Sequence, residues 1–117
     1  MENKVPEHRR SARHKCALPV QLHCAGQSYP TSGETTDVSV RGCYVKLLFP
    51  LPVGTQVDVR IALPDGEVKA KGVIRTFDPA LGNGLEFTEM LPASQAELEH
   101  CLKEFPEASE GGFDIIR

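Results

Sequence analysis

The chain has 117 residues, a formal net charge of −3 and 40% hydrophobic residues, values that fit one soluble globular domain with a core of its own. Its slight acidity argues against general nucleic-acid binding, its apolar runs are too short to cross a bilayer, and its N-terminus lacks an apolar signal core. We therefore expect a cytoplasmic protein that binds neither DNA nor RNA and does not insert into a membrane.

Residues 1–14 are predicted to form a flexible, basic N-terminal arm. They are polar and charged, show neither helical nor strand periodicity, and include Pro6. Five cations lie within the first sixteen residues: Lys4, Arg9, Arg10, Arg13 and Lys15. Since the far end of the chain is acidic, a basic arm on an acidic body indicates a small anionic partner that is bound locally.

Residues 15–90 are predicted to form a β-barrel. Val20, Leu22 and Cys24 alternate with polar residues, as in a half-buried strand. A second strand is predicted over Glu34–Val40, and a third over Cys43–Phe49 with Phe49 on its apolar face.

The second half of this region repeats the pattern. Alternation through TQVDVRIAL predicts a strand, PDG a hairpin turn, EVKAKGVIRTF the returning strand, and LEFTEM a last short strand. Six strands with short connections and no helix between them indicate an all-β antiparallel sheet. A six-stranded antiparallel barrel is the economical form, because closure removes exposed edges.

Residues 93–105 are predicted to form a C-terminal α-helix. An apolar face repeats at i, i+3, i+4 and i+7, and consists of Leu98, Cys101, Leu102 and Phe105. Ser94 and Glu97 match a capping box at its start. Residues 106–117 are expected to be a loose tail, so that the whole chain, 1–117, forms a single domain.

Cysteines, histidines and carboxylates show no enzyme or metal signature. The four cysteines fit neither a zinc site nor a disulfide scaffold, and three of them, Cys24, Cys43 and Cys101, fall in register with apolar neighbours. The sequence contains no phosphate-cradling glycine loop and no nucleophile elbow. We therefore expect a protein without catalytic residues, metal or cofactor.

Two polar segments, HRRSAR in the arm and DVSVRG at residues 37–42, carry the chemistry of a binding site. A guanidinium pairs with phosphate oxygens or with the O6 and N7 acceptors of guanine, and it stacks on purines. A carboxylate accepts hydrogen bonds from guanine N1–H and N2–H₂, a serine hydroxyl donates to a phosphate, and a glycine permits close approach. Together these groups suit a guanine nucleotide with more than one phosphate.

The same residues form two motifs. Arg9 and Arg13 match RxxxR, and Asp37, Ser39 and Gly42 match DxSxxG about two dozen residues later. In this order and on a small barrel, the pair of motifs resembles the PilZ domain family, which comprises bacterial receptors for cyclic di-GMP. The resemblance implies a six-stranded barrel with a C-terminal helix.

It also implies a role for each motif residue. Arg9 and Arg13 clamp the phosphates and guanine edges, Asp37 takes a guanine donor edge, Ser39 bonds a guanine or a phosphate, and Gly42 leaves room beside the strand. The arginines at two variable motif positions add phosphate contacts. The implied ligand-binding residues are Arg9, Arg10, Arg13, Asp37, Ser39, Arg41 and Gly42.

We thus expect a cyclic di-GMP receptor and adaptor, whose arm becomes ordered on binding and alters a surface that a partner protein reads. One alternative is a PilZ-like domain that binds no nucleotide and serves as a protein-interaction module. Another is a small RNA-binding barrel, which needs exposed aromatic residues, whereas most of those present look like core. Locally, Asp37 and Ser39 are also suited to capping a bulge, and Arg41–Gly42 to forming a turn.

Overall fold

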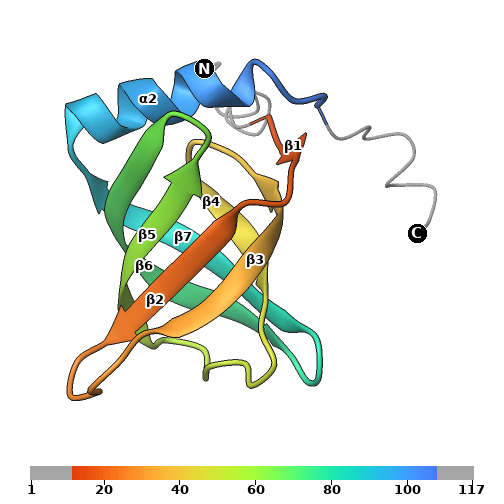
Figure 1. Cartoon of the computed structure of the whole chain (residues 1–117). Helices are drawn as coiled ribbons and strands as arrows, with labels where there is room; N and C mark the ends of the chain where they lie inside the picture. Colours follow the sequence, from red (N-terminus) through yellow and green to blue (C-terminus); the bar gives the residue numbers. More distant parts are fainter. Residues whose placement is uncertain (1–11, 108–117) are drawn as a thin grey trace, which may run out of the picture.

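The computed structural model describes residues 12–107, which form seven strands and one helix (Figure 1). The elements are β1 (His14–Lys15), β2 (Pro19–Cys24), β3 (Thr31–Val38), β4 (Gly42–Lys46), β5 (Gln56–Leu63), β6 (Gly66–Asp78), β7 (Gly82–Met90) and α2 (Pro92–Leu102).

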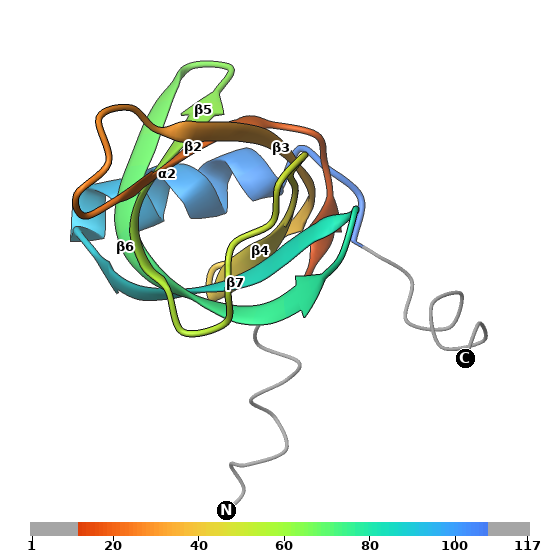
Figure 2. The ribbon, with the colours of Figure 1, turned by 90° about the horizontal axis from the view of Figure 1, so that it is seen from below.

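Strands β2 to β7 close into an antiparallel barrel. The strand order is β1-β3-β2-β5-β6-β7-β4, and β4 pairs back onto β3. Viewed from the end opposite α2, the strands form a ring with the helix behind it (Figure 2). The predicted fold class, a six-stranded antiparallel barrel with a C-terminal helix, is confirmed. The short β1 pairs with the end of β3 on the edge opposite β4, where His14 lies opposite Val38 and Lys15 opposite Asp37.

Alternating side chains fill the barrel. In β5, for example, Val57, Val59 and Ile61 are buried while the residues between them are exposed. Each fully buried Val or Ile side chain contributes about 1.5–3 kcal/mol through the hydrophobic effect. All four cysteines are buried free thiols, which confirms the prediction that Cys24, Cys43 and Cys101 act as small apolar residues.

A β-bulge in β3 determines which way the candidate site faces. The β3–β4 register shifts between Thr35 and Asp37. Thr35 points inward and is only 1% exposed; its Oγ1 accepts a hydrogen bond from Leu18 N (2.9 Å) and donates one to Cys16 O (2.7 Å). With Thr35 fixed inside, Asp37 projects from the outer surface.

Helix α2 lies across one open end of the barrel, where Leu98, Cys101 and Leu102 are buried (Figure 1). The predicted capping box is wrong. Leu91 is the N-cap residue and makes no side-chain cap bond, and Pro92 occupies the first turn. Ser94 already lies inside the helix, and its hydroxyl accepts a hydrogen bond from Lys69 N (3.3 Å) in β6.

The third strand is shorter than its apolar pattern predicted. Strand β4 ends at Lys46, and Phe49 is 78% exposed in the connection that follows. The expectation that most aromatic residues belong to the core is also wrong, because Tyr29 and Phe77 are exposed as well. Within residues 12–107 the structure contains no helix long and apolar enough to span a membrane.

Candidate functional site

Arg13 and Asp37, predicted from separate motifs, lie together at the corner between β1 and β3. The Arg13 guanidinium contacts Asp37 Oδ1 through Nε (3.0 Å) and Nη2 (2.9 Å). The second carboxylate oxygen accepts a hydrogen bond from Thr36 Oγ1 (3.2 Å). Since the Arg13 and Asp37 side chains are 52% and 24% exposed, the ion pair contributes at most about 1 kcal/mol to stability. The carboxylate oxygens retain lone pairs for further donors.

Ser39 closes the turn between β3 and β4. Its side chain is buried, and its Oγ accepts hydrogen bonds from Arg41 N (3.0 Å) and Gly42 N (3.2 Å) while lying 3.3 Å from Gly42 O. Ser39 N also donates to Gly42 O (2.8 Å). In this structure the hydroxyl therefore shapes the turn that carries Arg41, in the manner of a local serine turn.

Gly42 allows β4 to approach β7 closely. A Cβ atom at this position would lie 2.1 Å from the carbonyl oxygen of Leu85, which is backbone and cannot move aside. Gly42 pairs with Glu86 in the β4–β7 ladder. Strand packing alone therefore requires a glycine at this position, independently of any contact with a ligand.

Arg41 is exposed at the tip of the same turn, and its carbonyl oxygen accepts a hydrogen bond from Phe87 N (2.8 Å). Arg9 and Arg10, the remaining predicted site residues, lie outside the described residues. The structure thus brings Arg13 to Asp37 and places Ser39, Arg41 and Gly42 in one adjoining turn.

The residues after Arg13 are held by the chain segment that follows α2. His14 Nδ1 is 3.0 Å from Phe105 O, and Lys15 N donates to Pro106 O (3.1 Å). His14 also forms an antiparallel bridge with Glu107. Arg13 is therefore positioned from two sides, by β3 and by the chain that follows α2.

The outer face beside Asp37 contains residues that the sequence interpretation left out of the site. Asp37 pairs with Tyr44 and Tyr44 with Gly84, so these residues form one outward row across β3, β4 and β7. The Tyr44 hydroxyl donates to the Asp78 carboxylate; burial, followed by this hydrogen bond, raises the pKa of Tyr44 to about 12. Arg75 forms an ion pair with Glu86 on the same face. Alternation with the inward Cys43 and Val45 already indicated that Tyr44 faces outward.

Behind this corner the Cys43 thiol is protonated at neutral pH. Burial raises its pKa to about 12, and the Asp37 carboxylate raises it while the Arg13 guanidinium lowers it. Because the thiolate is the reactive form, Cys43 is not an activated nucleophile. Among residues 12–107, no three or more His, Cys, Asp or Glu side chains are grouped so that they could hold a metal ion.

The fold and this corner define a small, closed antiparallel barrel, capped by one helix, with an arginine–aspartate pair where the N-terminal segment meets β3. The PilZ domain family model matches residues 7–104, and the chain belongs to the PilZ domain family. PilZ domains are receptor and adaptor domains rather than enzymes. The chain has no significant match among curated protein sequences.

Solved structures share the fold. The PilZ domain of CeSA from a cellulose-synthesizing bacterium has a TM-score of 0.65 and 23% identity, covering 80% of this chain and 97% of that one. The PilZ domain of YcgR from Escherichia coli, solved with c-di-GMP, has a TM-score of 0.66 and 14% identity, with 83% and 90% covered. The Bacillus subtilis inhibitor of motility (MotI/DgrA) has a TM-score of 0.68 and 21% identity, with 82% of this chain and 50% of that one covered.

Proposed function

We propose that this protein is a bacterial, cytoplasmic receptor for cyclic di-GMP, and that it passes the signal to a partner protein. The observation that carries the proposal is the Arg13–Asp37 pair beside the Ser39–Gly42 turn, on a chain that belongs to the PilZ domain family. The YcgR domain, which shares the fold, was solved with c-di-GMP. Family, fold and local chemistry therefore support the same ligand.

The proposed roles follow from the chemistry of each group. Arg13, with Arg9 and Arg10 from the preceding segment, binds phosphates and guanine acceptor edges. Asp37 accepts hydrogen bonds from guanine N1–H and N2–H₂. Arg41 adds a phosphate contact from the tip of the turn, which the buried Ser39 hydroxyl shapes and in which Gly42 keeps the backbone close to β7.

The proposed mechanism concerns the segment that precedes Arg13. On binding, this segment takes a fixed position over the ligand and changes the surface that the partner reads. Ordering residues costs about 1–2 kcal/mol each, so part of the contact energy is offset. Because Lys15 N is already bonded to Pro106 O, ligand is expected to slow amide hydrogen exchange mainly before Arg13.

Isothermal titration with cyclic di-GMP tests the ligand assignment. Arg13→Ala removes a charged, bidentate donor, a loss of roughly 2–5 kcal/mol that corresponds to at least about 30-fold in Kd. Arg60→Ala is the matched control, since Arg60 is also an exposed arginine but lies on β5, across the barrel from β4. We expect it to bind as the wild type does.

Two results would contradict the proposal. An absence of heat with the wild type at micromolar ligand would remove cyclic di-GMP as the ligand and favour the interaction-module alternative. Equal affinity in wild type and Arg13→Ala would show that Arg13 does not bind the ligand. The thermal midpoint of the unliganded Arg13→Ala variant should remain within a few degrees of the wild type, because an exposed ion pair contributes at most about 1 kcal/mol.

A further inference from the structure

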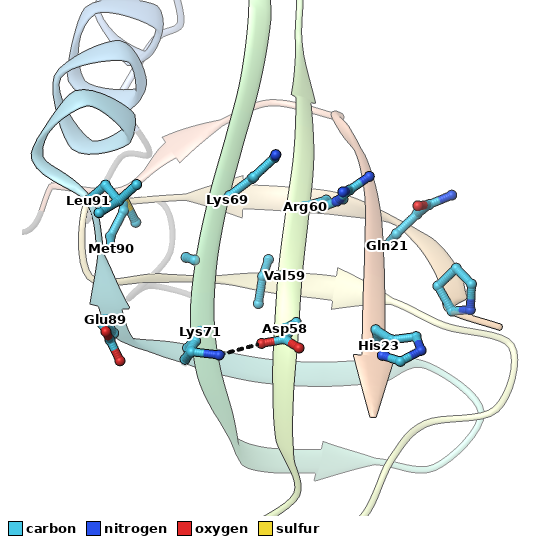
Figure 3. A pocket seen from close by; sticks show the side chains of 12 residues that line it. Gln21, His23, Asp58, Val59, Arg60, Lys69, Lys71, Glu89, Met90 and Leu91 are labelled. Atoms are coloured by element: carbon cyan, nitrogen blue, oxygen red, sulfur yellow. Dashed lines mark hydrogen bonds and ion pairs between the residues drawn. The ribbon is translucent and has the colours of Figure 1, made fainter. Parts of the chain in front are cut away.

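A hollow of about 720 Å³ lies on the outer face of the barrel, across β2, β5, β6 and the end of β7, and reaches the start of α2 (Figure 3). In the ring of six strands, the β5–β6 pair lies opposite the β3–β4 pair that carries Asp37 and Ser39. The hollow is therefore separate from the candidate nucleotide site.

In one row of side chains across the hollow, charges of opposite sign lie beside each other. His23 lies opposite Asp58, Asp58 opposite Lys71, and Lys71 opposite Glu89 on successive strands. Lys71 Nζ is 2.9 Å from Asp58 Oδ1, and the pKa of Lys71 is raised, first by this hydrogen bond and by the charge of Asp58. Each charge in this row has an opposite charge beside it.

The neighbouring row carries two cations and no anion. Gln21 lies opposite Arg60, and Arg60 lies directly opposite Lys69 (Figure 3). Like charges that face each other across a strand pair destabilise a sheet. Within residues 12–107, neither the Arg60 nor the Lys69 side chain has an ion pair or hydrogen bond. Two cations thus project side by side into a hollow, and the fold gains nothing from their proximity.

We propose that this hollow binds an extended, acidic segment of a partner protein, with a carboxylate bridging Arg60 and Lys69. Residues directly opposite each other on paired strands have Cβ atoms about 5 Å apart, so the Arg60 guanidinium and the Lys69 ammonium can both contact one carboxylate. A bound carboxylate would also remove the repulsion between the two cations. Charge complementarity therefore selects an acidic occupant.

The remaining lining residues favour a peptide over other anions. Pro30 lies at one side of the hollow and Met90 and Leu91 at the other, with Leu91 68% exposed, so apolar side chains can be accommodated beside the acidic residue. No Phe, Tyr or Trp lines the hollow to stack on a base. The Asp58 and Glu89 carboxylates can accept hydrogen bonds from the N–H groups of a peptide backbone.

The dimensions agree with this occupant. Strands lie about 4.8 Å apart, so β2, β5 and β6 together offer a width of roughly 10–15 Å. An extended peptide of about four residues spans the same distance. Peptide binding in this hollow does not depend on cyclic di-GMP. One variant in each site therefore tests the two proposals separately.

The test uses the full chain and a fluorescein-labelled peptide of alternating leucine and glutamate, followed by fluorescence anisotropy. We expect saturable binding that weakens with added salt, and at least about a tenfold loss in the double variant Arg60→Gln/Lys69→Gln. The matched control is Lys46→Gln, because Lys46 is also an exposed lysine but lies on β4, across the barrel from β5. We expect this control to stay within about twofold of the wild type.

The Arg13→Ala variant should bind the peptide with wild-type affinity and bind cyclic di-GMP more weakly. The Arg60→Ala variant should bind the peptide more weakly and bind cyclic di-GMP with wild-type affinity. Removing one of two facing like charges is expected to leave the thermal midpoint equal or higher, which separates lost binding from unfolding. The proposal is overturned if the wild type does not bind at about 1 mM peptide, if the double variant binds equally well, or if a leucine–glutamine peptide binds as tightly. Displacement of the peptide by a short RNA at lower concentration would also overturn it.

Discussion

Replacing Asn83 is expected to be among the most destabilising single changes outside the apolar core. Its side chain is fully buried and makes three hydrogen bonds: Oδ1 accepts from Leu51 N (2.7 Å), and Nδ2 donates to Leu51 O (2.8 Å) and to Thr76 O (3.0 Å). These bonds attach the β4–β5 connection to β6 and β7 across the open end of the barrel. Asn83→Ala removes all three bonds and leaves backbone groups of Leu51 and Thr76 without these partners.

The magnitude follows from this count. Each bond contributes about 1 kcal/mol net, and an unpaired buried group costs a further 1–3 kcal/mol. Since Leu51 is only partly buried, water replaces some of the lost bonds, and we expect a loss of about 3 kcal/mol in the free energy of unfolding. For a domain of about 100 residues this lowers Tm by roughly 15 °C. Urea unfolding followed by circular dichroism measures it; a loss below about 1 kcal/mol would refute the reasoning.

Asn83→Asp tests the loss of the hydrogen-bond donor separately from the loss of side-chain volume, because Asp has nearly the shape of Asn but lacks its NH₂ group. Two carbonyl oxygens would face the new carboxylate, so its ionised form is disfavoured and its native pKa rises above the unfolded value of about 3.9. The native state then holds its proton when the unfolded chain has lost it. Stability relative to wild type is therefore greatest near pH 4 and falls as pH rises through the native pKa. Equal differences from wild type at pH 4 and pH 7 would contradict this.

Gly42→Ala is expected to destabilise the unliganded protein by about 1–3 kcal/mol in urea unfolding, because its Cβ would meet Leu85 O at 2.1 Å; unchanged stability would show that β4 and β7 separate easily. The Cys43 thiol, whose pKa burial raises from 9.0 to about 12, should not react with a thiol reagent at pH 8 until the chain unfolds. Because the native thiol keeps its proton where the unfolded one loses it, Cys43 contributes stability that falls as pH rises from about 9 to about 12. Phe49→Ser should change stability by less than about 0.5 kcal/mol, whereas Ile74→Ala should cost about 2–5 kcal/mol, since the two side chains are 78% and 0% exposed.

The barrel was predictable because alternation in a strand reports directly which side chains face the core. Val57, Val59 and Ile61 show this pattern in the sequence and are buried in the structure. Phe49 was mispredicted for a related reason. The apolar alternation continues beyond Lys46, but β4 pairs with β7 only over Gly42–Lys46. Periodicity shows which face of a strand is buried, whereas the strand ends where its partner does, and β7 begins at Gly82, opposite Lys46.

Site geometry was less accessible to sequence reasoning than site composition. The two motifs pointed to Arg13 and Asp37, and the structure places them in contact, but no local pattern fixes the distance between segments 24 residues apart. The Ser39 hydroxyl bonds to the nearby backbone N–H groups of Arg41 and Gly42, so it points into its own turn and not toward a ligand. The demand for glycine at position 42 comes from the Leu85 carbonyl, on a strand distant in sequence. Such effects require the fold before they can be recognised.

The Arg13–Asp37 contact also constrains the energetics of the proposed binding mode. A phosphate that takes Arg13 exchanges one ion pair for another, so the net gain is smaller than for an unpaired arginine. Asp37 then keeps its hydrogen bond from Thr36 Oγ1, and it gains further donors only if the ligand offers them, as guanine does through N1–H and N2–H₂. A simple phosphate or pyrophosphate lacks such donors and leaves the carboxylate uncompensated. The ion pair therefore disfavours generic anions and favours a ligand that carries a phosphate and a guanine edge together.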